Sequence, residues 1–140
     1  MRSAIVHQPI DLAALIAEVA ASSNGATVLF TGSVRELSEG RSVSGIDYDA
    51  YEAMAAEELA RIVREATERF GSTHVVAEHR VGSLALGEVS VAIAVGHPRR
   101  APAFEAARYV IEEIKLRLPV WKQELFTDGT REWVDARVAR

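Results

Sequence analysis

Two lysines are the residues of this sequence best suited to covalent or acid–base chemistry. They are Lys115 and Lys122, the only lysines in a chain that carries fourteen arginines. A lysine amine can lose its proton and attack a carbonyl carbon, whereas an arginine guanidinium stays protonated in proteins. Because nearly all other basic residues of the chain are arginines, each lysine marks a position where arginine does not serve. The alternative interpretation is two surface lysines whose stems cover apolar neighbours.

The elements around the lysines indicate how each is held. A helix is predicted from about Arg100 to the residue before Pro119, which stops it. Its apolar stripe consists of Phe104, Ala107, Ile111, Ile114 and Leu118. Lys115 lies at the border of this stripe, where partial desolvation favours the neutral and nucleophilic amine. Lys122 follows the proline, at the start of a predicted strand.

A second group of basic residues predicts an anion-binding site. His97, Arg99 and Arg100 occupy a short connection between a predicted strand and a predicted helix. Free backbone N–H groups and the positive end of the helix dipole gather at such a connection. Arg35, at the end of another predicted strand, is a further candidate for binding an anion. The competing interpretation is that these arginines are solvated loop residues.

Composition argues against several other classes of function. The chain has no cysteine, so it has no disulfide, thiolate metal site or cysteine nucleophile of its own, and any sulfur it handles comes from another molecule. His74 and His79 point to opposite faces of one predicted strand, without an acidic residue spaced to complete a metal site. We expect no metal and no cofactor. The net charge of −4 and the short apolar runs do not favour nucleic-acid binding or a membrane span. The first residues lack the features of a signal peptide, so a cytoplasmic protein is expected.

The order of predicted elements indicates a single α+β domain over residues 1–140, with a mostly antiparallel sheet and three helices. Helices are expected at about 11–21, 53–70 and 100–118. Strands are expected at about 3–8, 26–34, 43–51, 73–81, 88–95, 120–127 and 131–138. The strands at 26–34 and 43–51 are predicted to form a long hairpin around a mobile polar loop at 36–42. The last two strands are predicted to form a second hairpin around Asp128–Gly129.

The sequence resembles the family of molybdopterin synthase catalytic (large) subunits nearly from end to end. The landmarks are FTGSVR (30–35), YDAYEAMAAEEL (48–59), HRVGSLALGEVSVAIAV (79–95), RRAPAFEAARYVIEEIKLRLPVWKQE (99–124) and REWV (131–134). The lysine near a helix end, followed by a proline and an aromatic–lysine pair, is the most specific of them. The resemblance implies an α/β hammerhead-type fold.

By this resemblance, Lys115 and Lys122 are the two catalytic lysines, and both contact the substrate. Arg35 and Arg100 match arginines that line the pterin pocket. The remaining substrate-contacting positions that the resemblance implies are Ser33, Val34, Arg99, Gln123 and Glu124. The family usually has a histidine where this chain has Arg99, and an arginine there can bind an anion but cannot act as an acid or base near neutral pH.

The resemblance also implies partners and a reaction. The chain is expected to form a homodimer with a small ubiquitin-like sulfur-carrier subunit at each end. The carrier's Gly-Gly tail ends in a thiocarboxylate, whose sulfur passes to cyclic pyranopterin monophosphate to build the dithiolene of molybdopterin. Two other hypotheses remain at this point. One is a lysine enzyme that forms a Schiff base with a small phosphorylated carbonyl compound, and the other is a non-catalytic dimeric scaffold that docks a ubiquitin-like tail.

Overall fold

The computed structural model describes residues 1–135 and Arg137. In this part of the chain the elements follow the order β1 (Arg2–Val6), α1 (Leu12–Glu18), β2 (Ala26–Ser33), β3 (Leu37–Ser38), β4 (Arg41–Ala50), α2 (Glu52–Phe70), β5 (His74–Arg80), β6 (Gly82–Ala85), β7 (Val89–His97), α3 (Arg100–Arg117), β8 (Val120–Phe126) and β9 (Arg131–Asp135). The predicted α+β class with three helices is confirmed.

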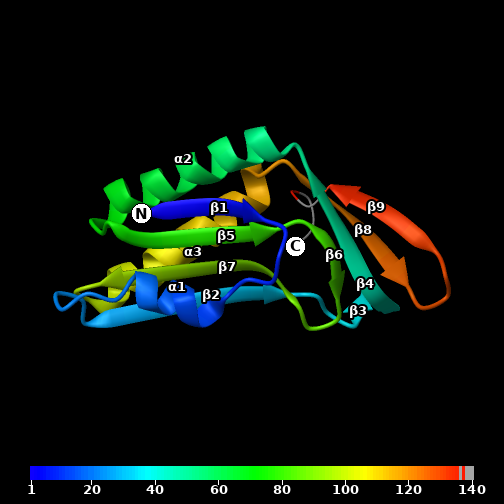
Figure 1. Cartoon of the computed structure of the whole chain (residues 1–140), viewed down its shortest axis with the longest axis horizontal. Coiled ribbons are helices and arrows are strands. Elements are labelled where there is room, and N and C mark those ends of the chain that lie inside the picture. The colour runs from blue at the N-terminus through cyan, green and yellow to red at the C-terminus, as the bar shows by residue number, and fades with distance from the viewer. Residues whose placement is uncertain (136, 138–140) are drawn as a thin grey trace.

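The first sheet has the strand order β1-β5-β7-β2. Only the β1–β5 pair in it is parallel, while β7 pairs antiparallel with both β5 and β2. These pairings agree with the mostly antiparallel sheet expected from the sequence. Figure 1 shows these four strands running side by side, with α2 along one edge.

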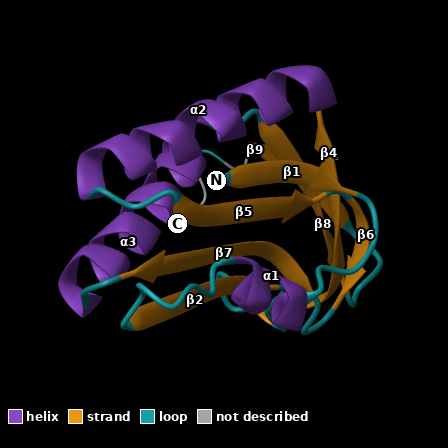
Figure 2. Cartoon of the chain, turned by 60° about the vertical axis from the view of Figure 1, so that its left-hand side comes forward, coloured by secondary structure: helices purple, strands orange, loops and turns teal. Residues whose placement is uncertain are grey.

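Helices cover both faces of the first sheet, as Figure 2 shows. Helices α2 and α3 pack on one face, where Leu59 and Ile62 of α2 meet Ile93 of β7 in the largest apolar cluster. Helix α1 covers the other face, with Leu15 against Ala94 of β7. Alternate residues of β7 thus enter two different cores, which explains why its sequence is almost continuously apolar. Full burial of each large side chain contributes about 1.5–3 kcal/mol.

The second sheet has the strand order β3-β4-β8-β9, with β6 also paired to β4. It lies beyond one end of the first sheet, on the right in Figure 1. Its inner face has a small core of its own, made by Val34, Val43, Ile46, Leu84 and Phe126. Strand β8 begins directly after α3 and Pro119, so the end of α3 meets the second sheet where the two sheets join.

Three predictions about local structure are wrong. Strands β2 and β4 do not form a hairpin, because β2 pairs with β7 and β4 pairs with β8 in the other sheet. A register shift at Gly32/Ser33 marks the point where the chain leaves the first sheet. The segment 36–42 is not only a loop, since β3 pairs with the start of β4 through a turn in which Gly40 has φ 80°. Phe104 is 62% exposed and does not belong to the buried stripe of α3.

The terminal hairpin is confirmed by the antiparallel pairing of β8 and β9 through Asp128–Gly129. The expected strand reached residue 138, and residues 136 and 138 lie outside the described part of the chain. In the described residues, no helix combines the length and the apolar character needed to cross a membrane.

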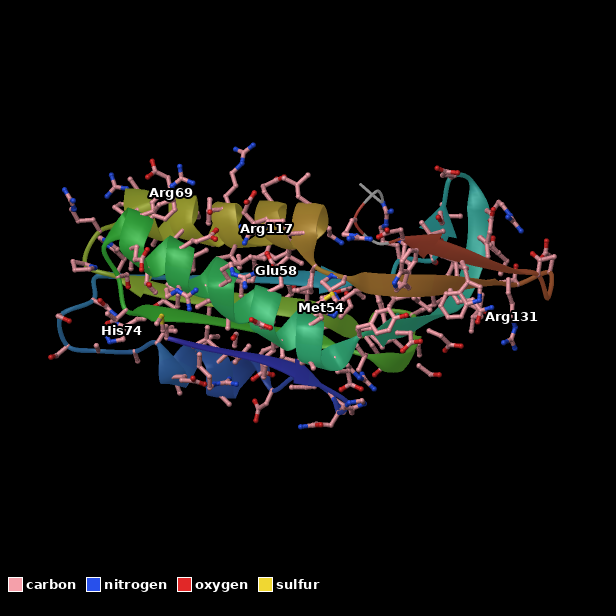
Figure 3. The ribbon with its side chains drawn as sticks, turned by 90° about the horizontal axis from the view of Figure 1, so that it is seen from above. Met54, Glu58, Arg69, His74, Arg117 and Arg131 are labelled. Carbon is pink, nitrogen blue, oxygen red and sulfur yellow. The ribbon has the colours of Figure 1, made fainter. Side chains whose placement is uncertain are left out.

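An ion-pair network joins α2 to α3. Arg117, near the end of α3, contacts Glu58 at 2.7 Å and Glu65 at 2.6 Å on α2, and also Glu113 at 3.1 Å on its own helix. Figure 3 shows Arg117 and Glu58 lying between the two helices. This network fixes the end of α3 from which Lys115 projects.

Candidate active site

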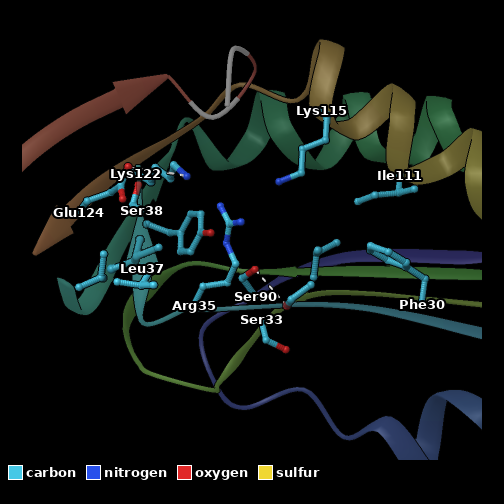
Figure 4. Close-up of a pocket in the computed structure, with 15 residues that line it drawn as sticks. Phe30, Ser33, Arg35, Leu37, Ser38, Ser90, Ile111, Lys115, Lys122 and Glu124 are labelled. Atoms are coloured by element: carbon cyan, nitrogen blue, oxygen red, sulfur yellow. Dashed lines mark hydrogen bonds and ion pairs between the residues drawn. The ribbon is translucent and has the colours of Figure 1, made fainter. Parts of the chain in front are cut away.

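A cavity of about 210 Å³ opens where the end of α3 meets the two sheets. Its walls come from both sheets and from α3, and the residues that line it are Phe30, Gly32, Ser33, Arg35, Leu37, Ser38, Val43, Ile46, Tyr48, Ser90, Val91, Ile111, Lys115, Lys122 and Glu124. Figure 4 shows Lys115 and Lys122 on opposite sides of Arg35, with Phe30 and Ile111 forming an apolar wall.

The two lysines reach this cavity from different elements. Lys115 lies in the last turn of α3, next to the buried Ile114. Lys122 lies on β8, whose alternation places it with Glu124 on the inner face of the second sheet. Pro119 separates the two elements and ends the helix, so the chain turns between them. The structure therefore brings together the two residues that the sequence singled out.

Burial and neighbouring positive charges alter the acid–base behaviour of Lys115. Lys115 is exposed as a whole residue, but desolvation around its amine lowers its pKa, and the charges of Lys122 and Arg35 lower it further. Desolvation and like charge both disfavour the protonated amine. Lys115 is thus closer to its nucleophilic form than a lysine in water.

The cavity carries a net positive charge. Arg35, Lys115 and Lys122 contribute three cations, and Glu124 contributes one buried carboxylate, 4.0 Å from the Lys122 amine. Fixed cations in a partly enclosed site attract anions more strongly than they do in open water. The apolar wall at Phe30 and Ile111 adds a surface for a flat ring. This combination suits a phosphorylated heterocycle.

Arg99 and Arg100 do not reach this cavity within one chain. Arg100 begins α3 and Lys115 lies in its last turn, and fifteen residues of helix span about 22 Å. Both arginines are exposed at the opposite end of the helix. Their backbone is held by His97, whose Nδ1 accepts the Arg99 backbone N–H at 3.0 Å and whose Nε2–H donates to the Phe70 carbonyl at 2.9 Å.

Four further predicted positions differ in how they face the cavity. Ser33 and Glu124 line it. Val34 directs its side chain into the small core of the second sheet and is 4% exposed. Gln123 alternates with Lys122 and Glu124 along β8, so its side chain faces the other side of that sheet.

Comparison with known proteins shows the family to which this chain belongs. The sequence model described as MoaE protein matches residues 5–117. The chain belongs to the MoaE family. A relative from Halalkalibacterium halodurans, a molybdopterin synthase catalytic subunit, is 43% identical over 133 residues, which cover 95% of this chain and 85% of the relative. A protein of the same name from Pyrococcus abyssi is 39% identical, with 94% of this chain and 89% of the relative covered.

Solved structures of MoaE relatives have the same fold. The crystal structure of molybdopterin synthase from Staphylococcus aureus matches with a TM-score of 0.88 at 37% identity, covering 94% of this chain and 95% of that one. A complex of subunits 1 and 2 of molybdopterin-converting factor from Helicobacter pylori matches with a TM-score of 0.76 at 26% identity, covering 96% and 91%.

Three polar residues of the cavity wall in this member of the MoaE family, Ser38, Tyr48 and Ser90, were not predicted from the sequence. A signal for Tyr48 was available in the alternation of β4, which places it on the same face as the buried Ile46. Ser90 lies in an apolar strand, at the register shift where Gly32 pairs with Val91 and Ser33 pairs with Val89, and alternation alone does not reveal such a shift.

Proposed function

We propose that this chain is the catalytic subunit of a molybdopterin synthase. It takes sulfur from the C-terminal thiocarboxylate of a small ubiquitin-like carrier subunit and transfers it to cyclic pyranopterin monophosphate. The observation that carries this proposal is the convergence of Lys115, Lys122 and Arg35 on one cavity with an apolar wall. The names of the MoaE relatives and the two-subunit complex of the Helicobacter pylori relative support it.

The lysines act where the carrier tail meets the pterin. The thiocarboxylate sulfur displaces an oxygen substituent from a carbon of the substrate and forms a thioester, whose bond between sulfur and the acyl carbon must then break. The acyl group then passes to the Lys115 amine or, if Lys115 only polarises the carbonyl, to water. Lys122 stabilises the negative charge that develops on the carbonyl oxygen or delivers a proton. The lowered pKa of Lys115 favours assigning the acyl-handling role to it rather than to Lys122.

Arg99 and Arg100 contribute to the site of a second copy of the chain. Their position at the far end of α3 leaves them outside the cavity of their own protomer, yet both match positions at which the family binds substrate. A homodimer in which the start of α3 from one protomer approaches the cavity of the other reconciles these facts. The arginines then hold the substrate phosphate together with Arg35.

Reconstitution tests the function directly. The purified chain is mixed with a carrier that ends in a Gly-Gly thiocarboxylate and with cyclic pyranopterin monophosphate, and the product is analysed by mass spectrometry. We expect a pterin that has gained two sulfur atoms. A matched carrier that ends in an ordinary carboxylate is expected to give none. Absence of sulfur in the product with the thiocarboxylated carrier contradicts the proposal, and trapping of substrate alone by borohydride indicates a Schiff-base enzyme instead.

A further inference from the structure

One flank of α3 carries an exposed stripe that continues the wall of the cavity. Four residues at spacings of four, seven and four positions share this side of the helix: Arg100, Phe104, Ile111 and Lys115. Ile111 and Lys115 line the cavity, and Figure 4 shows both projecting from the helix toward it. Arg100 and Phe104 occupy the part of the exposed stripe beyond the cavity.

The other sides of α3 have partners within the chain. Ala107 and Ile114 are buried in the core between the helix and the first sheet. Tyr109 and Arg117 face α2, where each contacts Glu65 at 2.6 Å. The exposed stripe therefore lies on the flank that points away from α2, beside β2, which is the edge strand of the first sheet.

Phe104 is the residue of this stripe that the site described above leaves without a role. Its side chain is 62% exposed, although it lies in line with Ile111. A single exposed apolar residue is common on protein surfaces, but Phe104 extends an apolar wall that Ile111 and Phe30 already form. A phenylalanine ring also buries a large area when a partner covers it. A partner on this flank would therefore gain most at Phe104.

The exposed stripe is complementary to a second copy of itself. In a twofold-symmetric dimer, each contact between two different residues occurs twice, once in each direction. Phe104 follows Arg100 by four residues and Ile111 precedes Lys115 by four, so both pairs are separated by about 6 Å along the helix. Two antiparallel α3 helices with Phe104 against the second copy's Ile111 therefore also place Arg100 against its Lys115. One arrangement covers the exposed ring and brings Arg100 to a cavity.

The charges near the symmetry axis of such a pair are offset within each helix. Arg108 lies close to this axis, at the solvent edge of the exposed stripe. Glu105 and Glu112 lie three residues before it and four residues after it, which are the spacings at which side chains on a helix interact. Their carboxylates reduce the repulsion between the two copies of Arg108.

We propose that Phe104 completes the cavity of a second copy of the chain, where it packs on Ile111 and extends the apolar wall against which the flat ring of the substrate lies. The nature of that ring rests on the proposed function, whereas the contact between Phe104 and Ile111 does not. The proposal adds an apolar contact across the dimer to the charged contact of Arg100.

Cysteine cross-linking tests the contact, because the native chain has no cysteine. Phe104→Cys and Ile111→Cys are combined in one chain, which is then oxidised mildly. Seven residues of helix separate the two positions by about 10.5 Å, beyond the Cα separation of about 7 Å that a disulfide spans, so a disulfide between them must join two chains. We expect a covalent dimer on a denaturing, non-reducing gel. Glu57→Cys/Arg64→Cys, with the same spacing on the exposed side of α2, is the matched control and is expected to remain a monomer on the gel.

Phe104→Ala measures what the contact contributes. We expect the dimer dissociation constant, measured by sedimentation, to rise by roughly tenfold or more, because two rings lose their partners in each dimer. At concentrations where the variant is still dimeric, a neutral pterin without phosphate is expected to bind roughly threefold to tenfold more weakly. Leu116→Ala, on a leucine of α3 that is 56% exposed and lies off the stripe, is the matched control and is expected to change neither quantity.

Each of three results would overturn the proposal. They are a native chain that sediments as a monomer, a double cysteine variant that forms no more covalent dimer than its control, and a dimeric Phe104→Ala chain that binds the pterin as tightly as the native one. Thermal unfolding of each variant is measured alongside, and the exposed position of Phe104 means that its replacement is expected to leave the protomer folded.

These outcomes are distinct from a failure of the proposed function. If the native chain transferred no sulfur but the cysteines cross-linked and Phe104→Ala weakened pterin binding, the reaction would fall and the role of Phe104 would stand. If sulfur transfer were confirmed and the cysteines did not cross-link, only the role of Phe104 would fall.

Discussion

Lys115 and Lys122 face one cavity from two different elements, and the charge of Lys122 adds to burial in lowering the pKa of Lys115. The arrangement assigns unequal properties to two residues of the same type. Lys122 instead lies beside the buried Glu124, whose carboxylate is 4.0 Å from its amine. One lysine is therefore prepared to act as an amine, and the other to act as a charge.

Exchange of each lysine for arginine tests this division of roles. Lys115→Arg keeps the positive charge but removes the ability to become a neutral amine, so product formation is expected to fall by several orders of magnitude. Lys122→Arg is expected to be milder, because a guanidinium still stabilises an anion. Molybdopterin formed from purified carrier and substrate is the measurement, and carrier binding is expected to persist in both variants.

Two results of that exchange contradict the assignment. Near-normal turnover by Lys115→Arg would rule out a nucleophilic amine, since a surface lysine changes stability by less than about 0.5 kcal/mol and leaves activity intact. Comparable losses in both variants would mean that the two roles are divided wrongly.

The pH dependence of sulfur transfer reports on the same amine. If neutral Lys115 is required, single-turnover rates rise with pH through the pKa of Lys115. Arg35→Gln removes one of the positive charges that lower this pKa, so the midpoint is expected to move to higher pH. Lys122→Gln is expected to shift it further in the same direction. Arg108→Gln, on an exposed arginine of α3 outside the cavity, is the control. An unchanged midpoint in both test variants would assign the titration to another group.

Arg100 is predicted to bind substrate across a dimer interface. Arg100→Ala is expected to keep its fold and to weaken pterin binding by roughly tenfold to a hundredfold, the value of a charge-assisted contact. Lys115→Ala is expected to be inactive by itself. A 1:1 mixture of the two variants, dissociated and reassembled, produces mixed dimers in which one of the two sites has both residues intact. Its activity is expected to recover to roughly a quarter of the native level. No recovery in verified mixed dimers would place Arg100 outside the partner's site.

The sequence predicted the positions of the helices and strands better than it predicted which strands pair with each other. Periodicity located α2 and α3 to within a residue or two, because their buried faces follow the helical repeat. Strand pairing was harder, since β2 and β4 are close in sequence but belong to different sheets, and alternation does not identify a strand's neighbours. The lysines were found by residue type. Tyr48 was missed because its place in the cavity depends on the pairing of β4 with β8, which sets it opposite Lys122.

The same limit applies to Arg99 and Arg100. Their position correctly indicated where the helix begins, but the resemblance assigned them to one substrate site with Lys115 without showing which protomer supplies them. The length of α3 separates these arginines from Lys115. We propose that a second chain brings them together, and single-chain patterns contain no direct signal for it.

The ion-pair network between α2 and α3 leads to a prediction about stability in acid. Glu65 accepts hydrogen bonds from Arg117 and Tyr109, which lower its pKa from 4.5 to about 2. A carboxylate whose pKa is lower in the folded state contributes stability above its unfolded pKa and loses that contribution as pH falls through its folded pKa. Glu65→Gln is therefore expected to cost about 1 kcal/mol at neutral pH, a value reduced by solvent exposure of the pair.

The difference in stability between the native chain and Glu65→Gln is expected to shrink steadily as pH falls from about 4.5 to about 2, because the native carboxyl takes up a proton over that range. Urea unfolding midpoints at a series of pH values measure it. Glu57→Gln is the matched control: its 3.6 Å contact with Arg61 joins two exposed side chains of α2, and such pairs contribute little. A difference that stayed constant from neutral pH to pH 2 would show that Glu65 contributes through shape and neutral hydrogen bonds, not through its charge.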